Sequence, residues 1–416
     1  MVKKMKETEI GIIPCDWDVL KLGDYCHIYR GGSPRPIQDY LTTADNGINW
    51  IKIGDVKAGD KYITSTEEKI IPEGTSMSRE VKAGDFILSN SMSFGRPYIL
   101  KINGCIHDGW LVIQDYQNSF DANYLYYLLS SEAVFAQYKK LAAGSGVQNL
   151  NKDIVTEVIL PHPEKKEQII IAEALSSIDE LINVLEKEIE KKKNIKYGVI
   201  QKLVVGEERL AGYTGNWVSI NMAKKSKLKA RIGWQGLTTA EYLDSGYSYL
   251  VTGTDFEDGH INWDECHYVT ADRYFQDPNI QLTNGDVLIT KDGTIGKVAL
   301  VDGLNKPATL NSGVFVVRPI NNAYSARFLY YVLESRVFRD FLDMLSAGST
   351  IVHLYQKDLV NFSFMAPATL EEQEAIASII YDMDCEIREF EDKLHKYKKI
   401  KQGMMNDLLT GKIRLV

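Results

Sequence analysis

Cysteine is scarce in this sequence, and no two of its cysteines form a Cys-x-x-Cys motif. The five are Cys15, Cys26, Cys105, Cys266 and Cys385. An odd, scattered set fits reduced thiols in a cytosolic protein and argues against a disulfide framework. His260, Cys266 and His267 lie close together, but a fourth ligand at a familiar zinc spacing is missing. We therefore expect no metal site.

Long apolar runs are also missing. No stretch is long enough to cross a bilayer as a helix, and no apolar stretch that could act as a signal peptide precedes Pro14. The sequence therefore predicts a cytoplasmic protein with no membrane partner.

Motifs for chemistry are absent as well. An amino-methyltransferase needs an Asn/Asp-Pro-Pro-aromatic motif, and the sequence contains no Pro-Pro and no convincing Gly-rich turn for S-adenosylmethionine. Gly293–Lys297 superficially suggests a phosphate-binding loop, but Val298 stands where Ser or Thr is required. Asp286 and Lys291 are too small a set for the metal-dependent site of a nuclease. We expect no catalytic residues and no cofactor on this chain.

Net positive charge is lacking too. The formal net charge of −8, taken alone, argues against a nucleic-acid-binding protein. The charge is unevenly spread, however: residues 224–231 hold four lysines and an arginine without an acidic residue, whereas residues 371–392 are crowded with Asp and Glu. A local basic surface can bind phosphate while acidic residues gather elsewhere.

What the sequence does contain is an internal repeat of about 205 residues. The segment Ala122–Leu129 recurs as Ala326–Leu333, 204 positions later. Other matches keep the same order, including Gly84–Leu88 with Gly285–Ile289 and Trp17 with Trp217. A chain of 416 residues is too long for one ordinary core, and the repeat divides it into two similar halves.

Each half begins with short apolar runs bounded by Gly, Asp, Asn and Pro, which predict strands and turns with two aromatic-rich helices. Each half ends in a long helix with apolar residues spaced alternately by three and four, a coiled-coil seam. The predicted seam residues are Leu175, Ile178, Ile182, Leu185 and Ile189 in the first copy, and Ile380, Met383, Ile387, Phe390 and Leu394 in the second.

A helix of about 40 residues would span roughly 60 Å and needs a partner for its apolar stripe. The predicted fold class is therefore α+β: two globular domains separated by two long helices that form an antiparallel coiled coil, related by a pseudo-two-fold repeat. The alternative is that each helix packs on its own domain. The predicted domains are residues 1–163 and 211–366, and the predicted spacer helices are residues 164–210 and 367–416.

Motifs in order along nearly the whole chain resemble one family. Ile13–Trp17 resembles an opening Pro-x-x-Trp, and Gly31–Pro34 resembles a Gly-Gly-Thr-Pro turn with Ser in place of Thr. Glu167-Gln168 and Glu372-Gln373, each followed by Ile-Ala, resemble the start of a shared helix. Ala230–Leu237 resembles part of one type of second recognition domain. The sequence is thus similar to the specificity subunits of type I restriction–modification systems.

The resemblance implies two target-recognition domains, each reading one half of a split site in double-stranded DNA. It implies helices that serve as a spacer and as docking surfaces for two methyltransferase subunits, which methylate adenine, with restriction subunits joining that complex. S-adenosylmethionine, ATP and Mg²⁺ would then belong to the partner subunits. Two alternatives stay open: a coiled-coil scaffold without a DNA role, and a DNA methyltransferase or nuclease with an unrecognised site.

Candidate DNA contacts are cations, amides, hydroxyls and aromatics in loops, which suit phosphates and base edges. In the first domain they are Arg30, Ser33, Arg35, Arg96, Ser145, Gln148 and Asn149. In the second domain they are Lys229, Arg231, Trp234, Gln235, Lys291, Thr294, Lys297, Ser349, Thr350, His353 and Tyr355. Each could instead belong to a solvated or helix-capping loop. The helical aromatics of Ala122–Leu129 and Ala326–Leu333 are predicted to be core rather than base-stacking residues.

Overall fold

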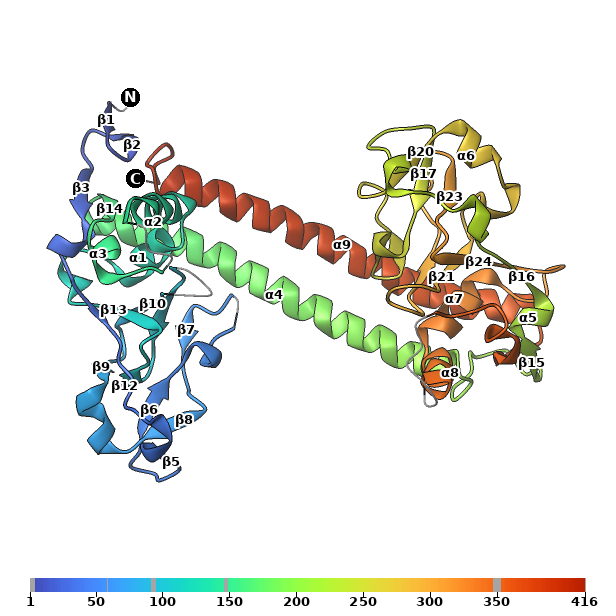
Figure 1. Cartoon of the computed structure of the whole chain (residues 1–416), viewed down its shortest axis with the longest axis horizontal. Coiled ribbons are helices and arrows are strands. Elements are labelled where there is room, and N and C mark those ends of the chain that lie inside the picture. Colours follow the sequence, from blue (N-terminus) through green and yellow to red (C-terminus); the bar gives the residue numbers. More distant parts are fainter. Residues whose placement is uncertain (1–3, 58, 91–94, 146–148, 347–352, 416) are drawn as a thin grey trace. The chain divides into compact units, whose positions relative to one another are not determined.

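The computed structural model describes residues 4–57, 59–90, 95–145, 149–346 and 353–415. The chain divides into two compact units. The first unit comprises Met1–Glu186 together with Lys393–Val416, and the second comprises Lys187–Asp392. Each unit thus contains the globular part of one repeat and portions of both long helices (Figure 1).

Two five-stranded sheets form the β part of the first unit. One has the order β4 (His27–Arg30), β13 (Trp110–Gln114), β10 (Phe86–Ser89), β11 (Pro97–Leu100) and β7 (Tyr62–Ile63). The other has the order β5 (Leu41–Thr42), β8 (Glu68–Ile70), β6 (Ile48–Ile51), β12 (Gly104–Ile106) and β9 (Arg79–Val81). All residues of β10 and β11 are buried, as expected of strands covered on both faces. Two short pairs are β1 (Met5–Thr8) with β2 (Gly11–Pro14), and β3 (Asp18–Lys21) with β14 (Ile159–His162).

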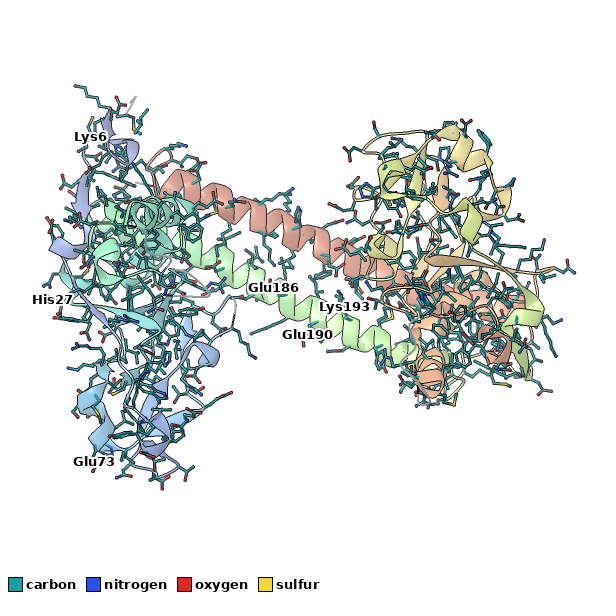
Figure 2. All side chains as sticks on the ribbon, viewed as in Figure 1. Lys6, His27, Glu73, Glu186, Glu190 and Lys193 are labelled. Atoms are coloured by element: carbon teal, nitrogen blue, oxygen red, sulfur yellow. The ribbon has the colours of Figure 1, made fainter. Side chains whose placement is uncertain are left out.

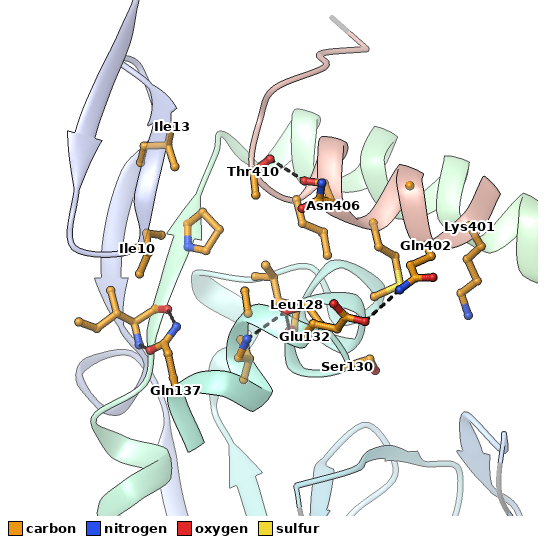
Figure 3. A pocket seen from close by; sticks show the side chains of 18 of the residues that line it. Ile10, Ile13, Leu128, Ser130, Glu132, Gln137, Lys401, Gln402, Asn406 and Thr410 are labelled. Carbon is orange, nitrogen blue, oxygen red and sulfur yellow. Dashed lines mark hydrogen bonds between the residues drawn. The ribbon is translucent and has the colours of Figure 1, made fainter. Parts of the chain in front are cut away.

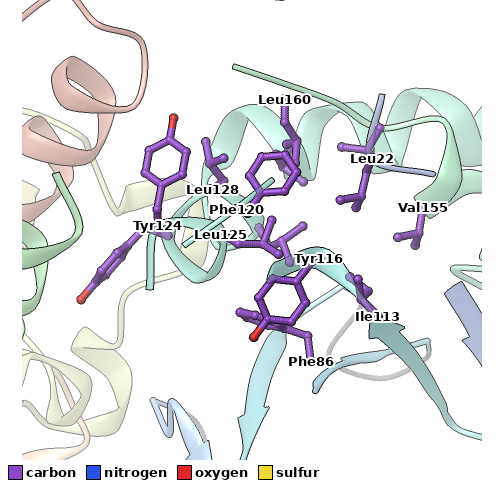
Figure 4. Close-up of a cluster of buried hydrophobic side chains, with 14 of the residues drawn as sticks. Leu22, Phe86, Ile113, Tyr116, Phe120, Tyr124, Leu125, Leu128, Val155 and Leu160 are labelled. Carbon is purple, nitrogen blue, oxygen red and sulfur yellow. The ribbon is translucent and has the colours of Figure 1, made fainter. Parts of the chain in front are cut away.

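The helices of the first unit are α1 (Ala122–Leu129), α2 (Glu132–Ser145) and α3 (Lys152–Thr156). Asp121 caps α1 by accepting hydrogen bonds from the backbone N–H groups of Asn123 and Tyr124. Side chains of α1 meet those of the sheet in one hydrophobic core, where Phe86 and Tyr116 lie among them (Figure 4). Tyr124 and Tyr127 are buried in this core, which confirms the prediction for these aromatics.

The second unit repeats the central pairing of the first. β21 (Val287–Thr290) pairs antiparallel with both β22 (Val298–Leu300) and β24 (Val314–Pro319), as β10 does with β11 and β13. The remaining strands are β15 (Trp217–Asn221), β16 (Ser226–Lys229), β17 (Ser248–Val251), β18 (Phe256–Glu257), β19 (His260–Ile261), β20 (His267–Val269), β23 (Ala308–Leu310) and β25 (Ser363–Pro367). The helices are α5 (Met222–Lys225), α6 (Ala271–Phe275), α7 (Ala326–Glu334) and α8 (Arg336–Ser346). Phe328, Tyr330 and Tyr331 of α7 are fully buried, again as predicted.

The long helices are α4 (Lys165–Leu203) and α9 (Leu370–Leu408), each of 39 residues. Most of the predicted seam is buried: Leu175, Ile178, Ile182, Leu185, Ile189, Ile380 and Ile387. Met383, Phe390 and Leu394 are half-buried. The coiled coil itself stays a prediction.

Ion pairs join α4 to α9 inside each unit. In the first unit, Lys401 Nζ lies 2.6 Å from Asp179 Oδ1, and Lys398 Nζ lies 2.7 Å from Glu186 Oε1. Figure 2 labels Glu186 on α4. The partner numbers fall as the α4 numbers rise, so these two segments run antiparallel.

The second unit holds the equivalent pairs. Lys196 Nζ lies 2.5 Å from Asp384 Oδ1, and Lys193 Nζ lies 2.8 Å from Glu391 Oε1. Tyr331 donates a hydrogen bond to Asp384 at 2.7 Å, as Tyr127 does to Asp179 in the first unit, also at 2.7 Å. A Tyr–Asp–Lys triad therefore recurs in both units, and in each the lysine comes from the helix of the other repeat.

A second set of ion pairs also joins a basic residue of one repeat to a carboxylate of the other. Arg209, which follows α4, donates two hydrogen bonds to the buried carboxylate of Glu372 at the start of α9. Arg414, which follows α9, pairs with the buried carboxylate of Glu167 at the start of α4. The repeat is therefore present in tertiary contacts as well as in sequence.

Within the described ranges, no helix is both long and apolar enough to cross a membrane.

Candidate nucleic-acid interface

The candidate interface in the first unit is a polar corner where the central strand β10 ends. Asn90 donates its backbone N–H to Gly109 O at 3.0 Å and accepts the N–H of Leu150 at 3.0 Å. Its side-chain amide donates to Asp108 O at 2.9 Å. Three loops distant in sequence, around residues 90, 108 and 150, therefore meet at one point. We call this the strand-end corner.

The second unit builds the same corner with other residues. Lys291, which follows β21, donates its N–H to Gly313 O at 2.8 Å and accepts the N–H of Leu354 at 2.9 Å. A second backbone hydrogen bond is shared by the two units: Gly95 N–H donates to Ser89 O at 2.8 Å, and Gly296 N–H donates to Thr290 O at 2.9 Å. Both glycines have positive φ, a conformation in which most side chains are strained.

Asp108 is the hub of the first corner. Its Oδ1 accepts a hydrogen bond from Ser33 Oγ at 2.9 Å and lies 2.9 Å from His107 Nε2. Its Oδ2 lies 3.3 Å from Arg35 Nη2, and its backbone oxygen accepts from Arg30 Nε at 3.3 Å. Burial acts to raise the pKa of Asp108, but the Ser33 hydrogen bond and the electrostatic interactions with His107 and Arg35 outweigh it and hold the pKa below its ordinary value. The carboxylate is therefore ionised at neutral pH.

The sequence prediction missed Asp108. The visible signal was the Asp-Gly pair that precedes β13, which is common in turns. Its partners Ser33 and Arg35 stand 75 and 73 positions earlier, so no local pattern joins them. The predicted residues Arg30, Ser33 and Arg35 do lie together around it.

The second corner carries different side chains. His353 Nδ1 lies 2.5 Å from Asp292 Oδ1, and Lys291 Nζ lies 3.2 Å from Asp292 Oδ2. Tyr355 is exposed beside them, with its ring 6.0 Å from that of His353. The structure therefore brings Lys291, His353 and Tyr355 together as a polar, partly charged surface.

The structure corrects two predicted contacts in the second unit. Arg231 is 2% exposed, because its Nε donates to Leu310 O at 2.8 Å and its Nη2 donates to Thr309 Oγ1 at 3.2 Å. Burial is the main cause that lowers its pKa. Gln235 is also buried. Neither buried side chain can reach DNA in this geometry, and the donors of Arg231 bind groups of its own domain.

The remaining predicted contacts stay predictions. The exposed ones are Arg96, Asn149, Lys229, Thr294 and Lys297. Outside what the structure describes lie Gln148, Ser349 and Thr350 and the side chains of Ser145 and Trp234.

No group of three or more His, Cys, Asp or Glu side chains that could hold a metal ion occurs among the described residues. A cavity of about 660 Å³ in the first unit is lined by apolar side chains such as Ile10, Ile13 and Leu128 (Figure 3). Its polar lining includes Glu132, which accepts a hydrogen bond from Gln402 at 3.0 Å. That pair holds α2 to α9 and does not resemble a catalytic pair.

Two units of one repeat, each with a polar corner built on the same backbone bonds, define a class of tandem-repeat proteins. The family model for the "Type I restriction modification DNA specificity domain" matches residues 14–195 and 240–401. The chain therefore belongs to the family of type I restriction–modification DNA specificity subunits.

Two relatives are similar in sequence to this chain over nearly its full length. The chain is 25% identical to the type I restriction enzyme MjaVIII specificity subunit of Methanocaldococcus jannaschii, over 97% of this chain and 94% of that protein. It is 24% identical to the putative MjaX specificity subunit of the same organism, over 99% and 97%.

Solved structures share the fold. The S subunit of a type I restriction–modification system from M. genitalium has a TM-score of 0.59 at 15% identity, over 98% of this chain and 99% of that chain. A chain from a study of complex assembly and conformational transition of the type I R-M system has the same TM-score at 17% identity, over 96% and 99%.

Proposed function

We propose that this specificity subunit binds a bipartite DNA site, with each unit reading one half. The observation that carries the proposal is the duplicated strand-end corner. The backbone bonds are the same in both units, but the polar side chains differ: Ser33, Arg35 and Asp108 stand in the first, Lys291 and His353 in the second. Because different hydrogen-bonding groups select different base edges, two unlike half-sites are expected.

We further propose that the chain directs adenine methylation and restriction without catalysing either. Two methyltransferase subunits would dock on the helices α4 and α9, and restriction subunits would join them. S-adenosylmethionine, ATP and Mg²⁺ would be bound by those partners. The absence of a Pro-Pro methyltransferase motif from the sequence supports this division of labour.

The test is to co-express the chain with the methyltransferase subunit of its own system and to map methylated adenines by single-molecule sequencing. We expect a two-part motif whose halves are unlike and are separated by a fixed gap. A single continuous motif would contradict the proposal. Methylation that does not depend on this chain would favour the scaffold alternative.

Catalytic inertness has its own test. The purified chain alone, given duplex DNA, Mg²⁺ and S-adenosylmethionine, is expected to transfer no methyl group and to cut no strand. The measurement is tritium incorporation from labelled S-adenosylmethionine together with gel analysis of a supercoiled plasmid. Turnover that co-purifies with the chain through two columns and scales with its concentration would favour the enzyme alternative.

A further inference from the structure

Arg35 stands out in the first unit because it is an exposed arginine held by a fixed carboxylate. Its side chain is 80% exposed, and among the described residues its hydrogen-bonding partner is Asp108. The bond from Nη2 to Asp108 Oδ2 leaves the other donors of the guanidinium fork free. Arg35 also lines an open groove, together with residues that include Gln38, Lys52 and His107.

The carboxylate of Asp108 is itself held in place by His107 and Ser33. The backbone N–H of Gly109 donates to His107 Nδ1 at 2.8 Å, so Nε2 carries the ring proton that points to Asp108 Oδ1. The ring of His107 meets the buried Trp50 edge-on, with 6.1 Å between centroids. Ser33 Oγ donates to the same Oδ1. Two donors thus saturate one carboxylate oxygen, and the other is left for Arg35.

A carboxylate at this place argues against a phosphate site. An ionised Asp108 repels phosphate oxygens and partly cancels the charge of Arg35, whereas a phosphate contact gains from unneutralised charge. Base recognition, in contrast, gains from a carboxylate that orients the arginine. A planar fork held in one orientation can donate two parallel hydrogen bonds to guanine O6 and N7, and each good bidentate pair discriminates strongly against other bases.

From this arrangement we infer that Arg35 reads a guanine in the half-site of the first unit, and that Asp108 is the positioning residue that orients it. The inference rests on the proposed function and names one of its base contacts.

The test measures specificity at single positions. The chain, assembled with its methyltransferase subunit, selects duplexes from a library randomised over the mapped motif. In Arg35→Ala and Arg35→Lys we expect the preference for guanine at one position of one half-site to fall on the order of 10- to 100-fold, with other positions unchanged. Lysine keeps the charge but lacks the fork, so it should not restore the preference. Asp108→Asn should relax the same position by a smaller factor.

Arg79→Ala is the matched control: this exposed arginine of the same unit lies over the ring of Tyr29 at 4.8 Å. It should leave every position unchanged. If Arg35→Ala folds, binds and keeps the wild-type motif, the inference is wrong while the proposed function stands. A uniform loss of affinity without relaxation would make Arg35 a phosphate contact and would also overturn it. Failure of the wild-type complex to select any two-part motif would instead refute the proposed function.

Discussion

Replacement of Lys196 by methionine is expected to destabilise the second unit by about 3–5 kcal/mol, because it leaves buried carboxylates without their cation. The side chains of Lys196 and Asp384 are only 14% and 6% exposed, and Lys196 Nζ also lies 3.3 Å from Glu334 Oε2. Burial acts to lower the pKa of Lys196, but the Glu334 and Asp384 charges outweigh it and raise the pKa. Native-state amide hydrogen exchange of the full chain measures the loss unit by unit.

The repeat supplies the control for this substitution. Lys401 occupies the equivalent place in the first unit, but it and Asp179 are 30% and 23% exposed. Water therefore screens that pair and solvates the carboxylate when the lysine is removed. Lys401→Met should cost about 1 kcal/mol, close to the range of exposed ion pairs. If Lys196→Met and Lys401→Met lose equal amounts of unfolding free energy, the difference in burial between the two triads does not determine their stability.

The Lys196 prediction also has a pH dependence. Burial is the main cause that raises the pKa of Glu334, and the charge of Lys196 counteracts it. Removal of Lys196 should raise that pKa further. An acid whose pKa is higher in the folded than in the unfolded state binds a proton preferentially when folded, so stability rises as pH falls through the folded pKa. The loss in Lys196→Met should therefore be smaller at pH 5 than at pH 8. An equal loss at both pH values would show that Glu334 does not take part.

The sequence was sufficient for features that repeat locally. Apolar residues spaced by three and four predicted the helices α4 and α9, and repeated aromatics predicted the cores around Tyr127 and Tyr331. It was insufficient where one side chain meets a partner far along the chain. Arg231 has the neighbours of a DNA-binding loop, but its donors are taken by Leu310 O, 79 positions later. Nothing near Arg231 shows which backbone oxygen will be within reach.

Charge reversal at two lysines of β16 is the second large effect that we expect, here on DNA affinity. Lys227 and Lys229 are exposed and alternate with the buried Ser226 and Leu228, so both project from one face of an edge strand. Within the described part of the chain neither forms an ion pair. Lys227 lies opposite Arg318, whose charge is taken up by the carboxylate of Asp286. Successive outward residues of a strand lie roughly 7 Å apart, so two separate phosphates can be contacted.

The variant Lys227→Glu/Lys229→Glu should bind the recognised duplex about 100-fold more weakly near physiological salt, since each phosphate contact supplies on the order of 1 kcal/mol and reversal adds repulsion. The magnitude of the negative slope of log K against log salt concentration should decrease by about 2, because roughly one counterion is released per phosphate contact. The recognised sequence should not change, since phosphate contacts carry no direct base information. Fluorescence anisotropy of the assembled complex at several salt concentrations provides both numbers.

Arg231→Ala is the informative comparison for these lysines because it removes a cation two positions along the chain from Lys229. It should lower the free energy of unfolding of the second unit by about 2–4 kcal/mol, since buried acceptors such as Leu310 O lose their donor. The salt slope of the folded fraction should stay at the wild-type value. The two lysine substitutions should do the reverse and leave stability within about 0.5 kcal/mol. A salt slope at the wild-type value in the lysine variant would contradict the assignment of Lys227 and Lys229 to the DNA-binding surface. A reduced slope in Arg231→Ala would contradict the assignment of Arg231 to the core.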